Sequence, residues 1–202
     1  MRRALTTTPA LLRQPLAFVD IETTGGSPAR SRVLEIGVVR VEAGRVVAEF
    51  RSLVDPEQPV PAFITSITGI RQADTVGAPR FGQLAGKVAE LLDGAVFVAH
   101  NVHFDYSFLR AEFERLGATF RPSLLCTVRL SRALYPAARG HKLQDLIDRH
   151  GLRADHRHRA YDDALVLWQF WQLVLRDFDL ATIEAALARQ LQPKPRLAAA
   201  ES

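Results

Sequence analysis

The sequence predicts one α/β domain with a mixed sheet of five strands flanked by helices. Three short, apolar, β-branched segments with brief links between them open the folded part, which is typical of an antiparallel meander. Strand and helix patterns then alternate, which favours further strands joined through helices. A chain of 202 residues, with 48% hydrophobic and 24% charged residues, fits a single globular domain of ordinary composition.

Each element follows from local periodicity and from the residues that end it. Alternating or continuous apolar runs predict the strands, and apolar residues at helical spacing before Gly or Pro predict the helices. The expected strands cover residues 16–22, 33–41, 45–54, 95–99 and 124–126. The expected helices cover residues 62–67, 81–92, 103–116, 127–134, 142–149, 160–176 and 179–191. We expect a flexible tail over residues 1–14, the main folded domain over 15–180, and a C-terminal helix with a Pro- and Ala-rich tail over 181–202.

Charge and composition narrow the class of partner and the compartment. The chain has 26 Lys and Arg against 22 Asp and Glu, and the net charge of +4 favours a polyanionic partner, although an Arg-rich proteome would give the same excess. The single cysteine, Cys126, excludes an internal disulfide. No apolar run approaches the roughly 18 residues of a membrane helix, and the start does not resemble a signal peptide. We therefore expect a cytoplasmic protein without a membrane partner.

A pair of acids ends the first predicted strand. Asp20 and Glu22 alternate with apolar residues, so both carboxylates point to the same face, about 6.5 Å apart along the backbone. At an effective dielectric of about 20 and a gap of about 5 Å, their repulsion is about 3 kcal/mol. A divalent cation between the two carboxylates would replace this repulsion with attraction. The alternative is an exposed strand end at which solvent screens both charges.

A second acid, Asp105, ends the segment 100–105, where a predicted strand meets a predicted helix. Asn101 is the expected N-cap, and Asp105 lies in the first turn, where the helix dipole favours a negative charge. Apolar residues follow Asp105 at i+3, i+4 and i+8, so its side chain belongs to the apolar stripe of the helix. A simple capping acid is the alternative interpretation.

A histidine and two adjacent aspartates open the long helix predicted from residue 160. Apolar residues follow Asp163 at i+3, i+4, i+7 and i+11, whereas Gln169 lies at i+7 from Asp162, so Asp163 is the inward acid. His158 lies just before this helix and can turn toward the same point. Because a histidine side chain exchanges protons near neutral pH, it can take a proton from water. The alternative for His158 is a surface residue, which is how we interpret His156.

The three motifs in this order resemble the DnaQ-like exonuclease family, in its histidine-containing DEDDh branch. The family pattern D-x-E-T-T-G, H-N-x-x-F-D and H-x-A-x-x-D stands here at residues 20–25, 100–105 and 158–163. The resemblance covers residues 15–176 and no catalytic position departs from it. It implies a ribonuclease H-like fold, an exonuclease domain over residues 15–180, and hydrolysis of terminal phosphodiester bonds from the 3′ end with release of nucleoside monophosphates.

The resemblance also implies catalysis by two metal ions. Two divalent ions about 3.5–4 Å apart can stabilise an attacking hydroxide and a leaving alkoxide. Hard oxygen ligands suit Mg²⁺ or Mn²⁺, and no Cys/His cluster has the spacing of a zinc site. By resemblance, Asp20 bridges the ions, Glu22 and Asp163 bind the nucleophile-side ion, Asp105 binds the second ion, and His158 is the general base.

Five further residues are candidates for substrate binding. Thr23 and Thr24 resemble family positions that contact the terminal nucleotide, partly through backbone N–H groups. Ile67 and Thr68 resemble the family segment that meets the terminal base and sugar, and Phe104 is a candidate to stack on a base. A turn after a strand, a helix end and a core phenylalanine are the alternatives for these three places.

Three functions are compatible with the motifs. The leading hypothesis is an exonuclease on single-stranded or mismatched DNA 3′ ends, similar to the proofreading (epsilon) subunit of bacterial DNA polymerase III, in proofreading or repair with a polymerase or repair protein as partner. RNA 3′-end trimming is the alternative, because nothing in the motifs reads the 2′-hydroxyl. A non-catalytic binding module on this fold would be expected to lack an acid or the histidine, and all five positions are filled.

Overall fold

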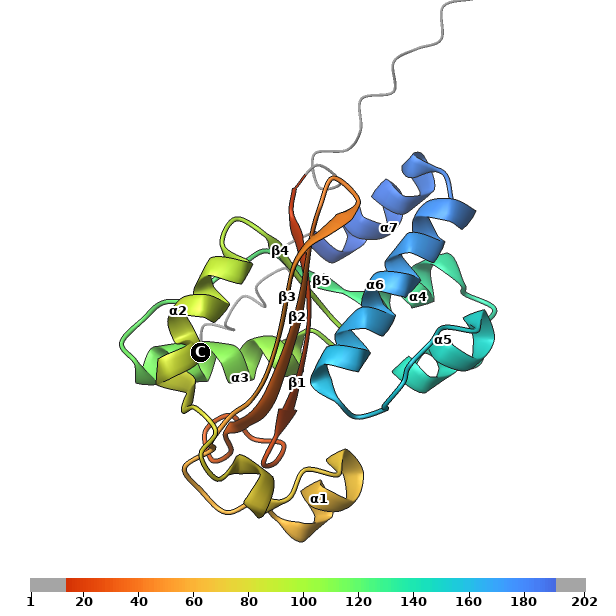
Figure 1. Cartoon of the computed structure of the whole chain (residues 1–202). Coiled ribbons are helices and arrows are strands. Elements are labelled where there is room, and N and C mark those ends of the chain that lie inside the picture. The colour runs from red at the N-terminus through yellow and green to blue at the C-terminus, as the bar shows by residue number, and fades with distance from the viewer. Residues whose placement is uncertain (1–13, 192–202) are drawn as a thin grey trace, which may run out of the picture.

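A mixed sheet of five strands forms the centre of the computed structural model, which describes residues 14–191 (Figure 1). The strands are β1 (Leu16–Thr23), β2 (Val33–Glu42), β3 (Arg45–Leu53), β4 (Val96–Ala99) and β5 (Leu124–Cys126). They lie in the order β3-β2-β1-β4-β5. β2 pairs antiparallel with β1 and β3, whereas β4 runs parallel to β1 and β5. The predicted meander and the predicted mixed sheet are both confirmed.

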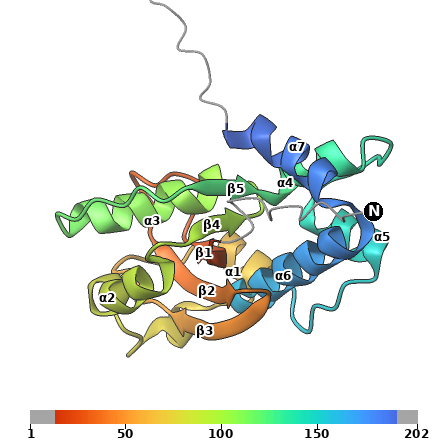
Figure 2. The same cartoon turned by 90° about the horizontal axis from the view of Figure 1, so that it is seen from above.

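Helices cover both faces of the sheet (Figure 2). They are α1 (Ala62–Thr68), the 3-10 helix η2 (Gln72–Thr75), α2 (Phe81–Leu92), α3 (His103–Arg115), α4 (Thr127–Leu134), α5 (Leu143–His150), α6 (Ala160–Asp177) and α7 (Leu180–Leu191). α2 and α3 lie on one face, and α4, α5, α6 and α7 lie on the other. None of the helices between residues 14 and 191 is long and apolar enough to cross a membrane. Apart from Gln14, the two predicted tails lie outside the described residues.

Each face of the sheet has its own buried cluster. On one face, Phe18 of β1 packs against α6, with its ring 5.5 Å from that of Trp168. On the other face, the intervening residues of β1 pack against α2 and α3 around the buried Phe108. Helix α7 belongs to the first cluster through Ile183 and Leu187, which are buried. The described part of α7 therefore packs on the same core as α4 and α6.

The polar end of β1 interrupts the first of these faces. The alternation that buries Phe18 continues to Asp20 and Glu22 on the same side of the strand. Asp20 pairs with Gly37 of β2 and Glu22 pairs with Glu35, after which the register shifts. Helix α1 lies beyond this end of β1 (Figure 1). The two acids therefore lie at the end of the sheet that is nearest to α1 and to the start of α6.

The start of α3 corrects one expectation, because Asn101 is not its N-cap. The helix begins at His103, Val102 precedes it, and no side chain caps it. Asn101 lies in the left-handed conformation with φ of +67°, and its carbonyl oxygen accepts a hydrogen bond from the Phe104 N–H at 2.9 Å. Asparagine adopts this conformation more readily than most residues. Asn101 therefore forms a turn before α3 and does not cap the helix.

Candidate active site

Three elements bring the five predicted site residues to one end of the sheet. β1 carries Asp20 and Glu22, α3 carries Asp105, α6 carries Asp163, and His158 precedes α6. Glu22, His158 and Asp163 each offer one ligand atom, and these atoms lie within 4.8 Å of one another. Asp20 is close enough to the other three acids that each of them raises its pKa. The structure therefore gathers all five residues into one cluster.

Asp105 reaches this cluster from the opposite face of the sheet. It lies in the first turn of α3 and is only 2% exposed, so it is not a solvated capping acid. Burial raises the pKa of Asp105 to about 8, although hydrogen bonds from its own backbone N–H and from that of Ile21 act in the opposite direction. The bond from Ile21 ties the carboxylate to the segment of β1 between Asp20 and Glu22.

The two aspartates of α6 point in different directions. Asp163 is 4% exposed and faces the acids of β1, where the guanidinium of Arg157 forms an ion pair with it. The Asp162 carboxylate instead lies 3.4 Å from Nδ1 of the exposed His156. Helical spacing therefore identified the inward acid from the apolar residues that follow it.

His158 lies in a left-handed turn whose far side is anchored to the sheet. Its φ of +59° is uncommon for a residue other than glycine. The next residue, Arg159, donates from Nη2 and Nε to the Glu35 carboxylate at 2.6 and 3.0 Å, and the Ala160 N–H donates to the same group at 2.9 Å. Glu35 is 3% exposed, so this is a buried anchor. These hydrogen bonds fix the backbone directly after His158, whose imidazole is exposed.

The close approach of Gly37 supports the same turn. A Cβ at Gly37 would lie 2.3 Å from the backbone carbon of Ala160 and from the backbone nitrogen of Tyr161. Only glycine allows the start of α6 to lie this close to β2. The side-chain anchor at Glu35 and the absent side chain at Gly37 thus meet at Ala160, the first residue of α6.

Burial and mutual repulsion disfavour the ionised form of the acids. Burial, followed by the charges of Asp163 and other acids, raises the pKa of Glu22 to about 8, and burial followed by the charge of Asp105 raises that of Asp20 well above its usual range. Arg157 is the cation that lowers the pKa values of both Asp20 and Glu22. An excess of carboxylate oxygens over positive charge is the property of a site that binds divalent cations.

These shifts predict how the stability of the metal-free protein depends on pH. A carboxyl group whose folded-state pKa exceeds its unfolded value stabilises the fold at low pH and loses that contribution as pH rises through the folded value. For Glu22 and Asp105 this window runs from the usual range near 4 up to about 8. We expect the melting temperature in EDTA to fall between pH 6 and pH 9.

Divalent metal should oppose this loss of stability. At pH 8, Mn²⁺ at about 100 times its dissociation constant should raise the melting temperature by roughly 5–10 °C, because an ion that binds only the folded protein stabilises it. Differential scanning fluorimetry across pH, with and without metal, measures both effects. A melting temperature that stays level from pH 6 to pH 9 in EDTA would contradict the predicted repulsion.

The structure uses the side chains of the predicted threonines internally. Thr23 and Thr24 are buried, and the Thr23 hydroxyl donates to the Gly25 carbonyl at 2.8 Å. The Thr24 hydroxyl accepts from the Arg32 N–H at 2.9 Å, and the Thr24 N–H donates to the Arg32 carbonyl at 3.0 Å. The Thr68 hydroxyl, also buried, donates to the Ile64 carbonyl. These groups shape the loops beside the acids.

The two apolar candidates differ in exposure. On α1, Ile67 is 52% exposed and its helical neighbour Phe63 is 59% exposed, so α1 presents an apolar surface to solvent. Phe104 is half-buried, and its ring packs 5.0 Å from that of Phe108 in the core of α3. Ile67 is therefore the more accessible of the two for a base.

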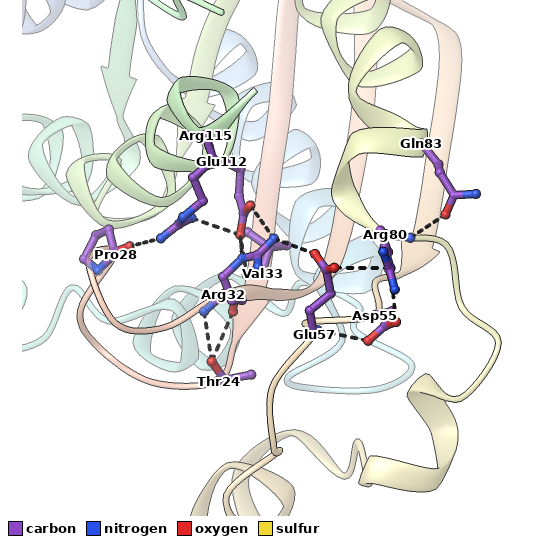
Figure 3. Close-up of polar contacts among 10 residues, drawn as sticks. All are labelled: Thr24, Pro28, Arg32, Val33, Asp55, Glu57, Arg80, Gln83, Glu112 and Arg115. Carbon is purple, nitrogen blue, oxygen red and sulfur yellow. Dashed lines mark hydrogen bonds and ion pairs between the residues drawn. The ribbon is translucent and has the colours of Figure 1, made fainter. Parts of the chain in front are cut away.

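A charged network holds the loop after Thr24 against α3 (Figure 3). Glu112 of α3 is 2% exposed and accepts from Nε and Nη2 of Arg32 at 2.8 and 3.0 Å. Arg115 pairs with the same carboxylate at 3.3 Å, and Arg32 extends the network to Glu57 at 3.3 Å. Because a buried ion pair is costly to break on one side only, this network fixes the loop between β1 and β2 on the C-terminal half of α3.

Four residues around the site have no place in the sequence motifs. Glu35, Gly37 and Arg159 anchor the turn of His158, and Arg157 neutralises Asp163. A glycine inside a predicted strand signals close approach of another segment, but it does not name that segment. The pairing of Glu35 with Arg159 joins residues 124 positions apart, so no local pattern predicts it.

Fold and site together define a nuclease of the ribonuclease H-like class, with acids from β1, α3 and α6 at one end of a mixed sheet. The chain belongs to the exonuclease family, because the RNase_T family model, described as Exonuclease, matches residues 17–170. The DnaQ-like family and the fold predicted from the motifs are therefore confirmed.

Named relatives are much longer than this chain. The 3'-5' exonuclease DinG of Bacillus subtilis (strain 168) is 38% identical over 156 residues, which is 76% of this chain and 17% of DinG. A DNA polymerase III PolC-type of Caldanaerobacter subterraneus is 37% identical over 155 residues, 77% of this chain and 11% of the polymerase. A zinc-bound crystal structure of the E. coli ExoI–ssDNA complex shares the fold, with a TM-score of 0.76 at 18% identity over 86% of this chain and 43% of that one.

Proposed function

We propose that this chain is a 3′→5′ exonuclease that removes nucleoside monophosphates from single-stranded or mismatched DNA 3′ ends. The observation that carries the proposal is the convergence of four acids and His158 at one end of the sheet. The names of the relatives, a 3'-5' exonuclease and a DNA polymerase, support DNA as the substrate class. We further propose a role in proofreading or repair, with a polymerase or repair protein as partner.

The cluster fits divalent metal ions. Its donors are carboxylate oxygens and one imidazole, and the acids have raised pKa values that a bound cation would relieve. We propose two ions of Mg²⁺ or Mn²⁺, because hard oxygen ligands suit these ions. When bound, such ions stabilise the attacking and the leaving oxygens of the hydrolysis. Asp20 would bridge them, Glu22 and Asp163 would hold the nucleophile-side ion, and Asp105 would hold the second.

The remaining chemistry belongs to the chain's own side chains. His158 is exposed and lies within 4.8 Å of Glu22 and Asp163, so it can accept a proton from a water molecule at these ligands. Ile67 contacts the terminal base from α1. We propose that Thr23, Thr24 and Thr68 hold the loops that receive the last nucleotide, and that Phe104 lines that place from α3.

Cleavage of labelled oligonucleotides tests this function. The protein is incubated with 5′-labelled single-stranded DNA, a primer with a mismatched 3′ end, or single-stranded RNA, in Mg²⁺, Mn²⁺ or Zn²⁺. We expect a ladder that shortens from the 3′ end of the DNA substrates in Mg²⁺ or Mn²⁺ and disappears in EDTA. Preference for RNA would support the trimming function instead, and activity in Zn²⁺ alone would reject Mg²⁺ and Mn²⁺.

Absence of cleavage on all three labelled substrates would contradict the proposed function. If folded protein binds labelled DNA in saturating metal but shortens none of the three substrates, the exonuclease proposal for this chain is wrong. The non-catalytic binding module is then the supported function.

Replacing His158 by asparagine tests the general base. Asparagine tolerates the positive φ at this position, so the backbone of the turn is kept while the proton acceptor is lost. We expect the cleavage rate to fall by about 10²–10⁴-fold, the usual contribution of general acid–base catalysis, with DNA affinity nearly unchanged. The wild-type protein, assayed under the same conditions, is the reference. A cleavage rate equal to that of the wild type would reject His158 as the base.

A further inference from the structure

Arg157 is the one cation paired with a site acid among the side chains that the structure describes. It precedes His158, its side chain is 25% exposed, and its Nη1 contacts Oδ1 of Asp163. Its Nε donates to Oε1 of Gln144 on α5 at 3.2 Å. The guanidinium thus spans from α5 to the acid that opens α6. None of the sequence motifs assigns a role to this residue.

A bound cation and Arg157 compete for the same carboxylate. Glu22, His158 and Asp163 present their ligand atoms within 4.8 Å of one another, and Arg157 contacts the carboxylate of Asp163. A divalent ion held there would repel the guanidinium and would take over the neutralisation that Arg157 provides. Binding of an ion therefore favours the departure of Arg157 from Asp163.

An open groove of about 610 Å³ adjoins the position of Arg157. Its lining includes residues 68–70 at the end of α1 and, from the loop before α6, His156, Arg157 and Arg159. The acid of this groove, Asp74, is already paired with Arg71 at 2.9 Å. Arg159 is held by Glu35, so Arg157 is the guanidinium of this groove that departure from Asp163 would make available, beside the candidate site for the last nucleotide at α1. A planar guanidinium suits a phosphodiester, because its N–H groups pair with two phosphate oxygens at once.

We propose that Arg157 couples metal binding to strand binding: it holds Asp163 in the metal-free protein, and once an ion displaces it, it binds a backbone phosphate of the nucleic acid in this groove. The inference rests on the proposed function, because it takes the strand to be the substrate. It makes Arg157 a substrate-binding residue whose availability depends on the metal.

The Arg157→Gln variant separates the two halves of this inference. Titration calorimetry with Mn²⁺ alone should show about tenfold tighter metal binding than in the wild type, the effect of removing one charge-assisted hydrogen bond that competes for Asp163. Fluorescence anisotropy should use a 5′-fluorescein oligothymidylate with phosphorothioate linkages at its 3′ end, so that it is not consumed. In Mn²⁺ the variant should bind this strand about tenfold more weakly than the wild type does. In EDTA the variant and the wild type should bind it with equal affinity.

Arg153→Gln is the matched control, because Arg153 is exposed on the same loop and only its backbone is bonded, to Gln169. It should leave both affinities unchanged. Unaltered Mn²⁺ affinity in Arg157→Gln, or a strand-binding loss that is equal in EDTA and Mn²⁺, would overturn the inference. Wild-type cleavage in the oligonucleotide assay distinguishes that outcome from failure of the proposed function, in which the wild type itself shortens none of the substrates in saturating metal.

Discussion

Replacing Asp20 by asparagine is expected to lower the cleavage rate by about 10³-fold or more, because a metal ion's charge stabilisation contributes several kcal/mol and each 1.36 kcal/mol is tenfold in rate. Asp20 is the acid on which the charges of Asp105, Asp163 and Glu22 all act. An amide of the same shape keeps the packing of β1 but offers no anionic oxygen to bridge two ions. Initial rates on 5′-labelled single-stranded DNA in Mn²⁺ measure the effect.

The same substitution should have the opposite effect on stability without metal. Asparagine replaces a buried acid whose ionisation burial and the neighbouring acids oppose, so the melting temperature in EDTA at pH 8 should rise above that of the wild type. Asp162→Asn is the matched control, since it makes the same chemical change at the adjacent aspartate of α6, whose carboxylate lies beside the exposed His156. An Asp20→Asn protein that keeps its rate within about tenfold of the wild type would exclude the bridging role.

The secondary structure was predictable because its signals are local. The strand alternation of β1 put Asp20 and Glu22 on one face, and the apolar stripe of α6 selected Asp163 over Asp162. Both statements need only the fixed periods of strand and helix. Asn101 shows the limit of this reasoning, because the same side chain suits an N-cap and a left-handed turn, and nearby residues do not decide between them.

The gathering of the site could not be derived from periodicity. Asp105 approaches β1 from the face opposite to α6, and its closeness appears only in the folded structure, in the bond from the Ile21 N–H and in its charge effect on Asp20. The family resemblance predicted this arrangement, because the order of the three motifs identifies a family whose fold is known. Local periodicity alone does not give that information. The resemblance supplied nothing on Arg157 or Glu35, whose contacts depend on the left-handed turn at His158.

The tie between β2 and α6 is the feature that sequence patterns miss most completely. In the sequence, Gly37 is only a glycine inside a predicted strand, which indicates a bulge or a close approach of another segment. Its structural meaning appears only when α6 is in place, because the backbone at Ala160 occupies the volume that a side chain would need. Glu35, two residues earlier on the same face of β2, accepts hydrogen bonds from Arg159 and Ala160. β2 thereby places both the histidine turn and the first turn of α6.

Gly37→Ala is therefore expected to destabilise the protein by about 3 kcal/mol, at the upper end of the usual cost of overpacking, because the obstacle is backbone that cannot change rotamer. The melting temperature should fall by roughly 6–12 °C. Since the displaced segment carries Asp163 and follows His158, the cleavage rate at a temperature where the variant is folded should fall as well. Urea unfolding and initial rates measure the two effects.

Gly86→Ala on α2 is the matched control for the same chemical change. Nothing lies within 4 Å of a Cβ at Gly86, and this residue is inside a helix, where alanine is favoured over glycine by up to about 1 kcal/mol. The control should thus be as stable as the wild type or more so, with an unchanged cleavage rate. If Gly37→Ala unfolds at the wild-type urea concentration, the close approach of β2 to α6 does not limit stability. If it is destabilised but cleaves at the wild-type rate, β2 supports the fold without positioning His158 and Asp163.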